Sequence, residues 1–316
     1  MLSYLVMSNL RAATAVAPAL WGTTYLVTTE LLPPDRPLLA GTLRALPAGL
    51  LLVAIVRALP RGTWWWRAAV LGTLNIGLFF ALLFVAAYRL PGGVAAVLGA
   101  LGPFVVAGLA FALLGQRPGG RVLAAAGVGL AGVALLVLRS ATALDPIGLA
   151  AAAGGMVSMS LGTVLGRRWG VPDGFAERRT ALLALTGWQL TVGGLLLAPA
   201  ALMVEGLPAG LSLANAGGFA YLSLVGTAGA YFLWFRGVTA LPPAQVTLLG
   251  LLSPVVAAAL GWLALGQSLS PGQLAGAAAV LAAVLLGSVP RPAAPRPLPP
   301  VGLSANPAGG RGCPST

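Results

Sequence analysis

Long apolar stretches separated by short polar groups run along most of the chain. Each stretch holds about 20 mostly apolar residues, the length that an α-helix needs to cross the hydrocarbon core of a bilayer, and a few Arg, Pro, Asp or Gly residues follow it. The pattern predicts an all-α integral membrane protein with ten transmembrane helices. Their expected ranges are 12–31, 38–56, 68–88, 93–115, 121–138, 147–165, 180–204, 216–235, 244–265 and 271–289.

The two ends of the chain differ from this pattern. We expect residues 1–11 to form a cytoplasmic N-terminus, and the first helix to be retained because Arg11 interrupts the apolar stretch that a cleavable signal would need. Residues 290–316 are rich in Pro, Gly and Ser, with too little apolar surface to offset the entropy of ordering. They are predicted to be a disordered cytoplasmic tail.

Composition supports a membrane protein without a metal or cofactor. The 316 residues are 58% hydrophobic and 8% charged, whereas soluble domains have roughly a quarter of their residues charged. The chain has no His and a single Cys, Cys313, in the tail. An intrachain disulfide is therefore excluded, and no metal site or other cofactor is expected.

The distribution of charge predicts the orientation of the chain. All 18 basic residues are Arg, and with the N-terminus inside, fourteen of them fall on cytoplasmic segments. The other four, Arg36, Arg44, Arg89 and Arg139, fall toward the opposite side. Because Lys and Arg are retained on the cytoplasmic side, we expect both termini inside the cytoplasmic membrane. The arginines mark helix ends instead of forming one patch, so no nucleic-acid partner is expected.

The chain contains an internal repeat. Residues 90–116 match residues 241–267 without a gap, at an offset of 151 residues, and Gly49–Leu52 and Gly194–Leu197 share the letters GLLL. The repeat divides the chain into five-helix units at 12–139 and 140–289. Because five is odd, the second unit must enter the bilayer with the opposite orientation, which is typical of secondary transporters that work by alternating access.

Several segments resemble a known family. They are ALWGTTYLV at 19–27, GTLRALPAGLLLV at 41–53, and the two repeated helices that end in LLGQ and ALGQ. Over residues 12–289 the chain is similar to EamA-type drug/metabolite transporters, which implies a ten-helix exporter of small metabolites. Family members often carry Glu where this chain has Gln116 and Gln267, so a coupling role for that carboxylate does not carry over.

Polar and aromatic residues inside the predicted helices are candidates for a solute pocket, because such residues usually face the bundle interior or a wet cavity. The alternative is that the aromatics fill the core and the hydroxyls bond to carbonyls one turn earlier. The candidates are Trp21, Thr24, Tyr25 and Thr28 on the first helix, Thr227, Tyr231 and Trp234 on the eighth, and Asn75, Phe79, Ser158, Gln189 and Gln245 elsewhere.

Three further residues have two interpretations each. Pro103 and Pro254 occupy equivalent positions in the fourth and ninth helices, where they either take part in gating or simply kink the helices for packing. Arg44 lies inside the second helix and could bind a carboxylate of the solute. Alternatively it reaches the outer headgroups or pairs with Glu30 or Asp35.

The leading functional prediction is a secondary transporter that exports small metabolites such as amino acids or related neutral or zwitterionic compounds. Without Lys there is no Walker A motif, and only Glu30, Glu205 and Asp145 lie near the pathway as proton-coupling carboxylates, so uniport stays open. A flippase for a lipid or lipid-linked sugar is an alternative; a membrane-embedded enzyme is disfavoured. The expected partners are the solute and membrane lipid, with the chain either a monomer or a homodimer.

Overall fold

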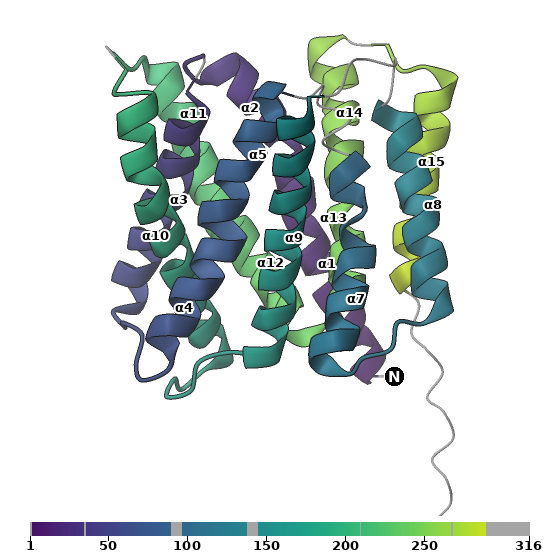
Figure 1. Cartoon of the computed structure of the whole chain (residues 1–316), viewed down its shortest axis with the longest axis horizontal. Coiled ribbons are helices and arrows are strands. Elements are labelled where there is room, and N and C mark those ends of the chain that lie inside the picture. The colour runs from purple at the N-terminus through teal and green to yellow at the C-terminus, as the bar shows by residue number, and fades with distance from the viewer. Residues whose placement is uncertain are drawn as a thin grey trace, which may run out of the picture.

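The computed structural model describes residues 2–34, 36–89, 97–137, 145–208, 210–266 and 268–288. Across these residues the regular secondary structure is entirely helical, and the helices run side by side (Figure 1). The expected tail, residues 290–316, lies outside the described residues, as do Asp35, Gln267 and the side chain of Tyr25.

The first half contains α1 (Leu2–Gly22), α2 (Thr24–Leu31), α3 (Pro37–Val56), α4 (Trp64–Gly72), η1 (Thr73–Gly77), α5 (Leu78–Arg89), α7 (Gly102–Leu114) and α8 (Gly120–Val137). The second half contains α9 (Pro146–Trp169), α10 (Arg178–Val204), α11 (Leu213–Ser223), η2 (Leu224–Gly229), α12 (Ala230–Ala240), α13 (Pro243–Gly250), α14 (Leu252–Leu265) and α15 (Pro271–Ser288).

Seven helical segments in the described part of the chain are long and apolar enough to cross a membrane. Two shorter apolar helices lie in α8 and in α15, one in each. An all-α membrane fold is thereby confirmed, while the number of ten spans stays a prediction. The first helix starts earlier than expected, at Leu2. Arg11 lies within this helix, and its side chain donates a hydrogen bond to Gln245 of α13.

Side chains cap several helix ends. The Asp145 carboxylate accepts hydrogen bonds from the backbone N–H groups of Ile147 and Gly148 at the start of α9. Glu205 caps α3 from the other half of the chain, since its two carboxylate oxygens accept the N–H groups of Leu38 and Leu39 at 2.7 and 2.8 Å. These contacts satisfy backbone donors that a helix start leaves unpaired.

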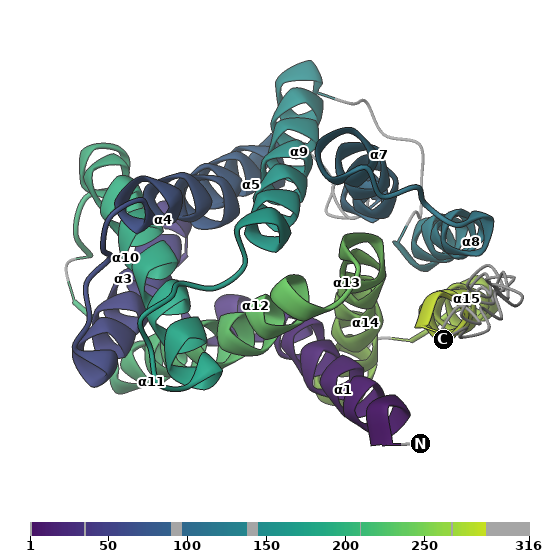
Figure 2. The same cartoon turned by 90° about the horizontal axis from the view of Figure 1, so that it is seen from below.

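Glycines allow two pairs of helices to pack backbone to backbone. A Cβ at Gly49 of α3 would lie 2.4 Å from the backbone nitrogen of Thr191 in α10, and one at Gly194 would lie 2.7 Å from the Cα of Leu46. In the second pair, α8 and α15, a Cβ at Gly276 would lie 2.6 Å from the Gly132 carbonyl oxygen. The view from below shows α8 and α15 together at one side of the bundle (Figure 2).

Five described spans deviate from a regular α-helix, and the first of them is broken at Thr23, between α1 and α2. Two contain a π-helical turn, η1 and η2, which begin 151 residues apart at Thr73 and Leu224. Two others are interrupted near their middle: α7 starts after Leu101, two residues before Pro103, and α14 starts after Leu251, three residues before Pro254. Each proline therefore lies in the first turn of the helix that follows the interruption, and a role in gating stays a prediction.

Candidate solute-binding site

A buried arginine lies at the centre of the candidate site. Arg44 is on α3, about two turns from the helix start, and only 9% of its surface is exposed. Its Nε donates a hydrogen bond to Thr227 Oγ1 in η2 at 3.2 Å, and its guanidinium carbon lies 5.2 Å from the ring centre of Phe80. Arg44 thus points into the bundle, and the prediction that it reaches the headgroups is wrong.

Arg44 has no carboxylate partner in the described part of the chain, where the one ion pair within 4.0 Å is Arg89–Asp145 at 3.2 Å. The predicted alternative of a pair with Glu30 is therefore wrong, and Asp35 lies outside the described residues. A cation within the bilayer is expensive to bury. An unneutralised one is suited to bind an anionic group of a ligand.

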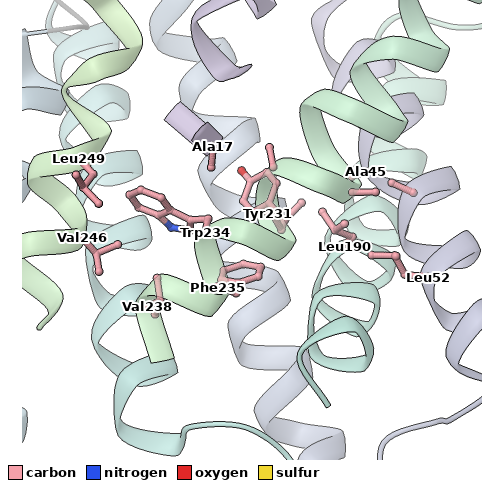
Figure 3. Close-up of a cluster of buried hydrophobic side chains, with 14 of the residues drawn as sticks. Ala17, Ala45, Leu52, Leu190, Tyr231, Trp234, Phe235, Val238, Val246 and Leu249 are labelled. Carbon is pink, nitrogen blue, oxygen red and sulfur yellow. The ribbon is translucent and has the colours of Figure 1, made fainter. Parts of the chain in front are cut away.

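Aromatic side chains form a cluster beside Arg44. The ring centre of Trp21 lies 5.0 Å from that of Tyr231 and 5.1 Å from that of Trp234, while Tyr231 also packs on Phe235 at 5.5 Å. Figure 3 shows Trp234 pointing toward Val246 and Leu249 of α13. The cluster therefore connects α1, α12 and α13.

Three polar atoms of α1, α2 and α12 are buried without a hydrogen-bond partner among the described residues. They are the indole nitrogens of Trp21 and Trp234 and the hydroxyl oxygen of Thr24. Buried polar groups are usually hydrogen-bonded, and an unsatisfied one costs about 1–3 kcal/mol. A polar solute that accepts hydrogen bonds from the two indoles would remove part of this cost.

A second polar group is only partly satisfied internally, because the amide oxygen of Asn75 is buried without a hydrogen-bond partner among the described residues. Asn75 in η1 donates to Gln189 of α10 at 2.8 Å, and Ser158 of α9 donates to the Leu74 carbonyl at 2.8 Å. A Cβ at Gly162 would lie 2.1 Å from the Asn75 amide oxygen, so α9 packs tightly on this amide. For Ser158 and Gln189 the structure therefore favours a packing role over direct contact with solute, whereas Asn75 keeps one buried acceptor without a partner in the described part.

The structure does not bring all predicted residues to the centre. Thr28 is exposed in the last turn of α2. Gln245 lies in the first turn of α13, where it accepts a hydrogen bond from Arg11 at 3.5 Å, so its predicted place in the central pocket is wrong. Phe79 is half-buried, 5.7 Å from Phe80 between ring centres. Tyr25 lies in α2, but its side chain is outside the described part.

Sequence reasoning missed Phe80 and Phe235. Phe80 lies 151 residues before Tyr231, the offset of the internal repeat, so that alignment could have identified it as the partner of a residue already chosen. The sequence-based prediction named its neighbour Phe79 instead. The contact with the Arg44 guanidinium depends on the π-turn that precedes Phe80.

Together, these features define a multi-pass helical membrane protein with a polar and aromatic site in its interior, as in membrane transporters. The chain belongs to the EamA-like transporter family, whose sequence pattern matches residues 12–138 and 146–289.

Individual relatives agree with this assignment. The chain is 47% identical to Protein PecM of Dickeya dadantii over 270 residues, which cover 85% of this chain and 89% of PecM. It is 30% identical to the uncharacterized inner membrane transporter YedA of Escherichia coli K12, over 84% of this chain and 86% of YedA. A protein of known crystal structure shares the fold at 20% identity, with a TM-score of 0.73 over 88% of this chain and 97% of that one.

Proposed function

We propose that the chain is a secondary transporter that exports amino acids or related zwitterionic metabolites across the cytoplasmic membrane by alternating access. The observation that carries this proposal is the buried guanidinium of Arg44, which has no carboxylate partner in the described part of the chain and lies beside an aromatic cluster. Arg44 would bind the solute carboxylate. The rings of Trp21, Tyr231 and Trp234 would contact its apolar part.

Alternating access requires two related halves, and reciprocal contacts support an inverted repeat. Gly49 packs against Thr191 while Gly194 packs against Leu46, and each residue of the first half lies 145 residues before its counterpart in the second. Such an exchange of partners is what a two-fold axis produces. Helices α3 and α10 also run in opposite directions (Figure 1), as inversion of one half requires.

The second helix pair repeats this relation. Gly132 packs against Val280, and Gly276 packs against Leu136, with an offset of 144 residues between counterparts. Two helix pairs with reciprocal contacts support one axis that relates both halves of the chain. In this arrangement, an inward-open and an outward-open state would have nearly equivalent packing, and the solute would shift the balance between them.

The transport assay uses proteoliposomes loaded with unlabelled solute and measures counterflow of labelled neutral amino acids. We expect uptake of at least one amino acid and weak uptake of its amide, which lacks the carboxylate. Arg44→Gln should lower the ratio of amino-acid uptake to amide uptake by roughly 10- to 100-fold, since a hydrogen bond to a charged group contributes about 1.5–3 kcal/mol. Arg61→Gln, which removes one exposed arginine after α3, is the matched control.

Two results would refute the proposal. One is counterflow with an unchanged preference for the carboxylate in Arg44→Gln. The other is movement of a fluorescent lipid between leaflets in the absence of amino-acid counterflow, which would favour the flippase alternative.

A further inference from the structure

A second group of arginines lines a cavity of about 390 Å³ near the end of the molecule where α1 begins. The cavity lies between α1, α7, the loop into α8, the start of α13 and the end of α15. Figure 2 shows how these helices are arranged. Arg11, Arg117 and Arg121 line it together with the neutral side chains of Gln116 and Gln245. Its lining therefore carries three positive charges and, among the residues that the structure describes, no carboxylate.

Arg11 has unused hydrogen-bonding capacity in this cavity. Its Nη2 donates to Gln245 at 3.5 Å, a long hydrogen bond, while its Nε is buried without a partner in the described part of the chain. Arginine presents a planar fork of N–H donors that matches phosphate oxygens. Helices α8 and α13 also begin at the cavity, so their positive dipole ends reinforce the preference for an anion.

The cavity has an apolar wall as well as a cationic rim. Ala107 of α7, Val122 of α8 and Leu286 of α15 contribute to this wall, and 45% of the Leu286 surface is exposed. A fully hydrated anion would make no use of such a wall. An amphiphile would, because its phosphate can face the arginines while its acyl chains follow the outer surface of the helices toward the bilayer.

We propose that this cavity binds the phosphate group of an anionic phospholipid. Basic pockets between transmembrane helices on the cytoplasmic side recognise anionic headgroups elsewhere. Placing the cavity in the cytoplasmic leaflet rests on the orientation predicted from the arginine distribution, with both termini inside; the binding itself does not. A bound phosphate would link α1, α8 and α13 through Arg11, Arg121 and the start of α13.

The test measures binding to the purified full chain in a neutral detergent. Native mass spectrometry gives the Kd, and thermal unfolding the stabilisation, for phosphatidylglycerol, phosphatidylcholine and glycerol 3-phosphate at equal concentrations. We expect phosphatidylglycerol to bind and to raise the Tm, and the zwitterionic lipid and the soluble phosphate ester to do neither. Glycerol 3-phosphate separates a lipid site from a site for soluble phosphate compounds.

Variants locate the binding in the cavity. An arginine near the membrane surface contributes about fivefold in affinity, so Arg117→Gln/Arg121→Gln should weaken phosphatidylglycerol binding by roughly 30-fold. Gln116→Glu, nearly isosteric, should weaken it by roughly fivefold through charge alone. The control, Arg61→Gln/Arg168→Gln, removes two exposed arginines outside the cavity and should leave the Kd unchanged.

Three results would overturn the proposal: equal binding of the two lipids, equal binding of phosphatidylglycerol and glycerol 3-phosphate, or an equal loss in the cavity and control variants. Arg44→Gln keeps this assay independent of the proposed transport function. It is expected to change solute preference and leave lipid binding unchanged, so either proposal can fail while the other holds.

Discussion

A methyl group at Gly132 has no room at the crossing of α8 and α15. The new Cβ would lie 2.8 Å from the Gly276 carbonyl oxygen and 2.9 Å from the Val280 nitrogen. Ordinary van der Waals contact begins near 3.4 Å, so Gly132→Ala must separate the two helices locally by about 0.6 Å. A gap of that size forfeits roughly a quarter to a half of the dispersion energy of the atoms that face it.

We expect Gly132→Ala to lower the free energy of unfolding by about 1–3 kcal/mol, as overpacking of a tight interior does. For a chain of this length the Tm falls by roughly 2–10 °C. Intrinsic tryptophan fluorescence during heating of the full chain in detergent measures this change. The crossing cannot adapt easily to the new methyl group, because the two atoms nearest to it belong to the backbone of α15.

Gly127→Ala on the same helix is the matched control. A Cβ at Gly127 has no neighbour within 4 Å, so the substitution should leave the Tm unchanged or raise it, because Ala has a helix propensity up to about 1 kcal/mol better than Gly. Equal Tm values for the two variants, or a more stable Gly132→Ala, would refute the packing argument.

Further predictions concern stability and orientation. Arg44→Met should raise the Tm, because it removes a buried cation that costs up to about 3 kcal/mol, while abolishing amino-acid counterflow; a lower Tm would contradict the unpaired state of Arg44. Glu205→Gln should destabilise the protein by about 1–2 kcal/mol, since an amide cannot accept both N–H groups at the start of α3. Glu177 precedes α10 but makes no side-chain cap, so the control Glu177→Gln should leave the Tm unchanged. After replacement of the native cysteine, an impermeant thiol reagent applied to intact cells should label Leu207→Cys and not Asp173→Cys; the reverse pattern would invert the proposed orientation.

The apolar pattern predicts which parts of the chain are helical, because the length and polarity of each stretch are local properties. It does not predict the depth of a side chain within the bundle. The predicted start of the second helix, residue 38, is within one residue of the start of α3 at Pro37, yet the guanidinium of Arg44 turns inward to Thr227 and not toward the headgroups. Gln245 shares the polar character of the central residues, but its position in the first turn of α13 places it beside Arg11.

The π-turns show a different limit of sequence reasoning. The segments Thr73–Gly77 and Leu224–Gly229 have little sequence in common, so no local signature identifies them. They form where the spans pack against α10 and α3, and Ser158 bonds to a carbonyl of the first turn. Tertiary packing therefore determines these turns, which is why only the structure reveals that Phe80 lies against Arg44.

An extra residue accommodated in a helix is also a phase shift. Because an α-helix advances by about 100° per residue, everything after η1 is rotated relative to a regular continuation of α4. Deleting one residue within Thr73–Gly77 would restore the regular phase and turn Phe80 away from the guanidinium, with every side chain of α5 otherwise unchanged in identity. In this span, the number of residues between α4 and α5 thus determines the geometry of the site as strictly as the identity of the residues does.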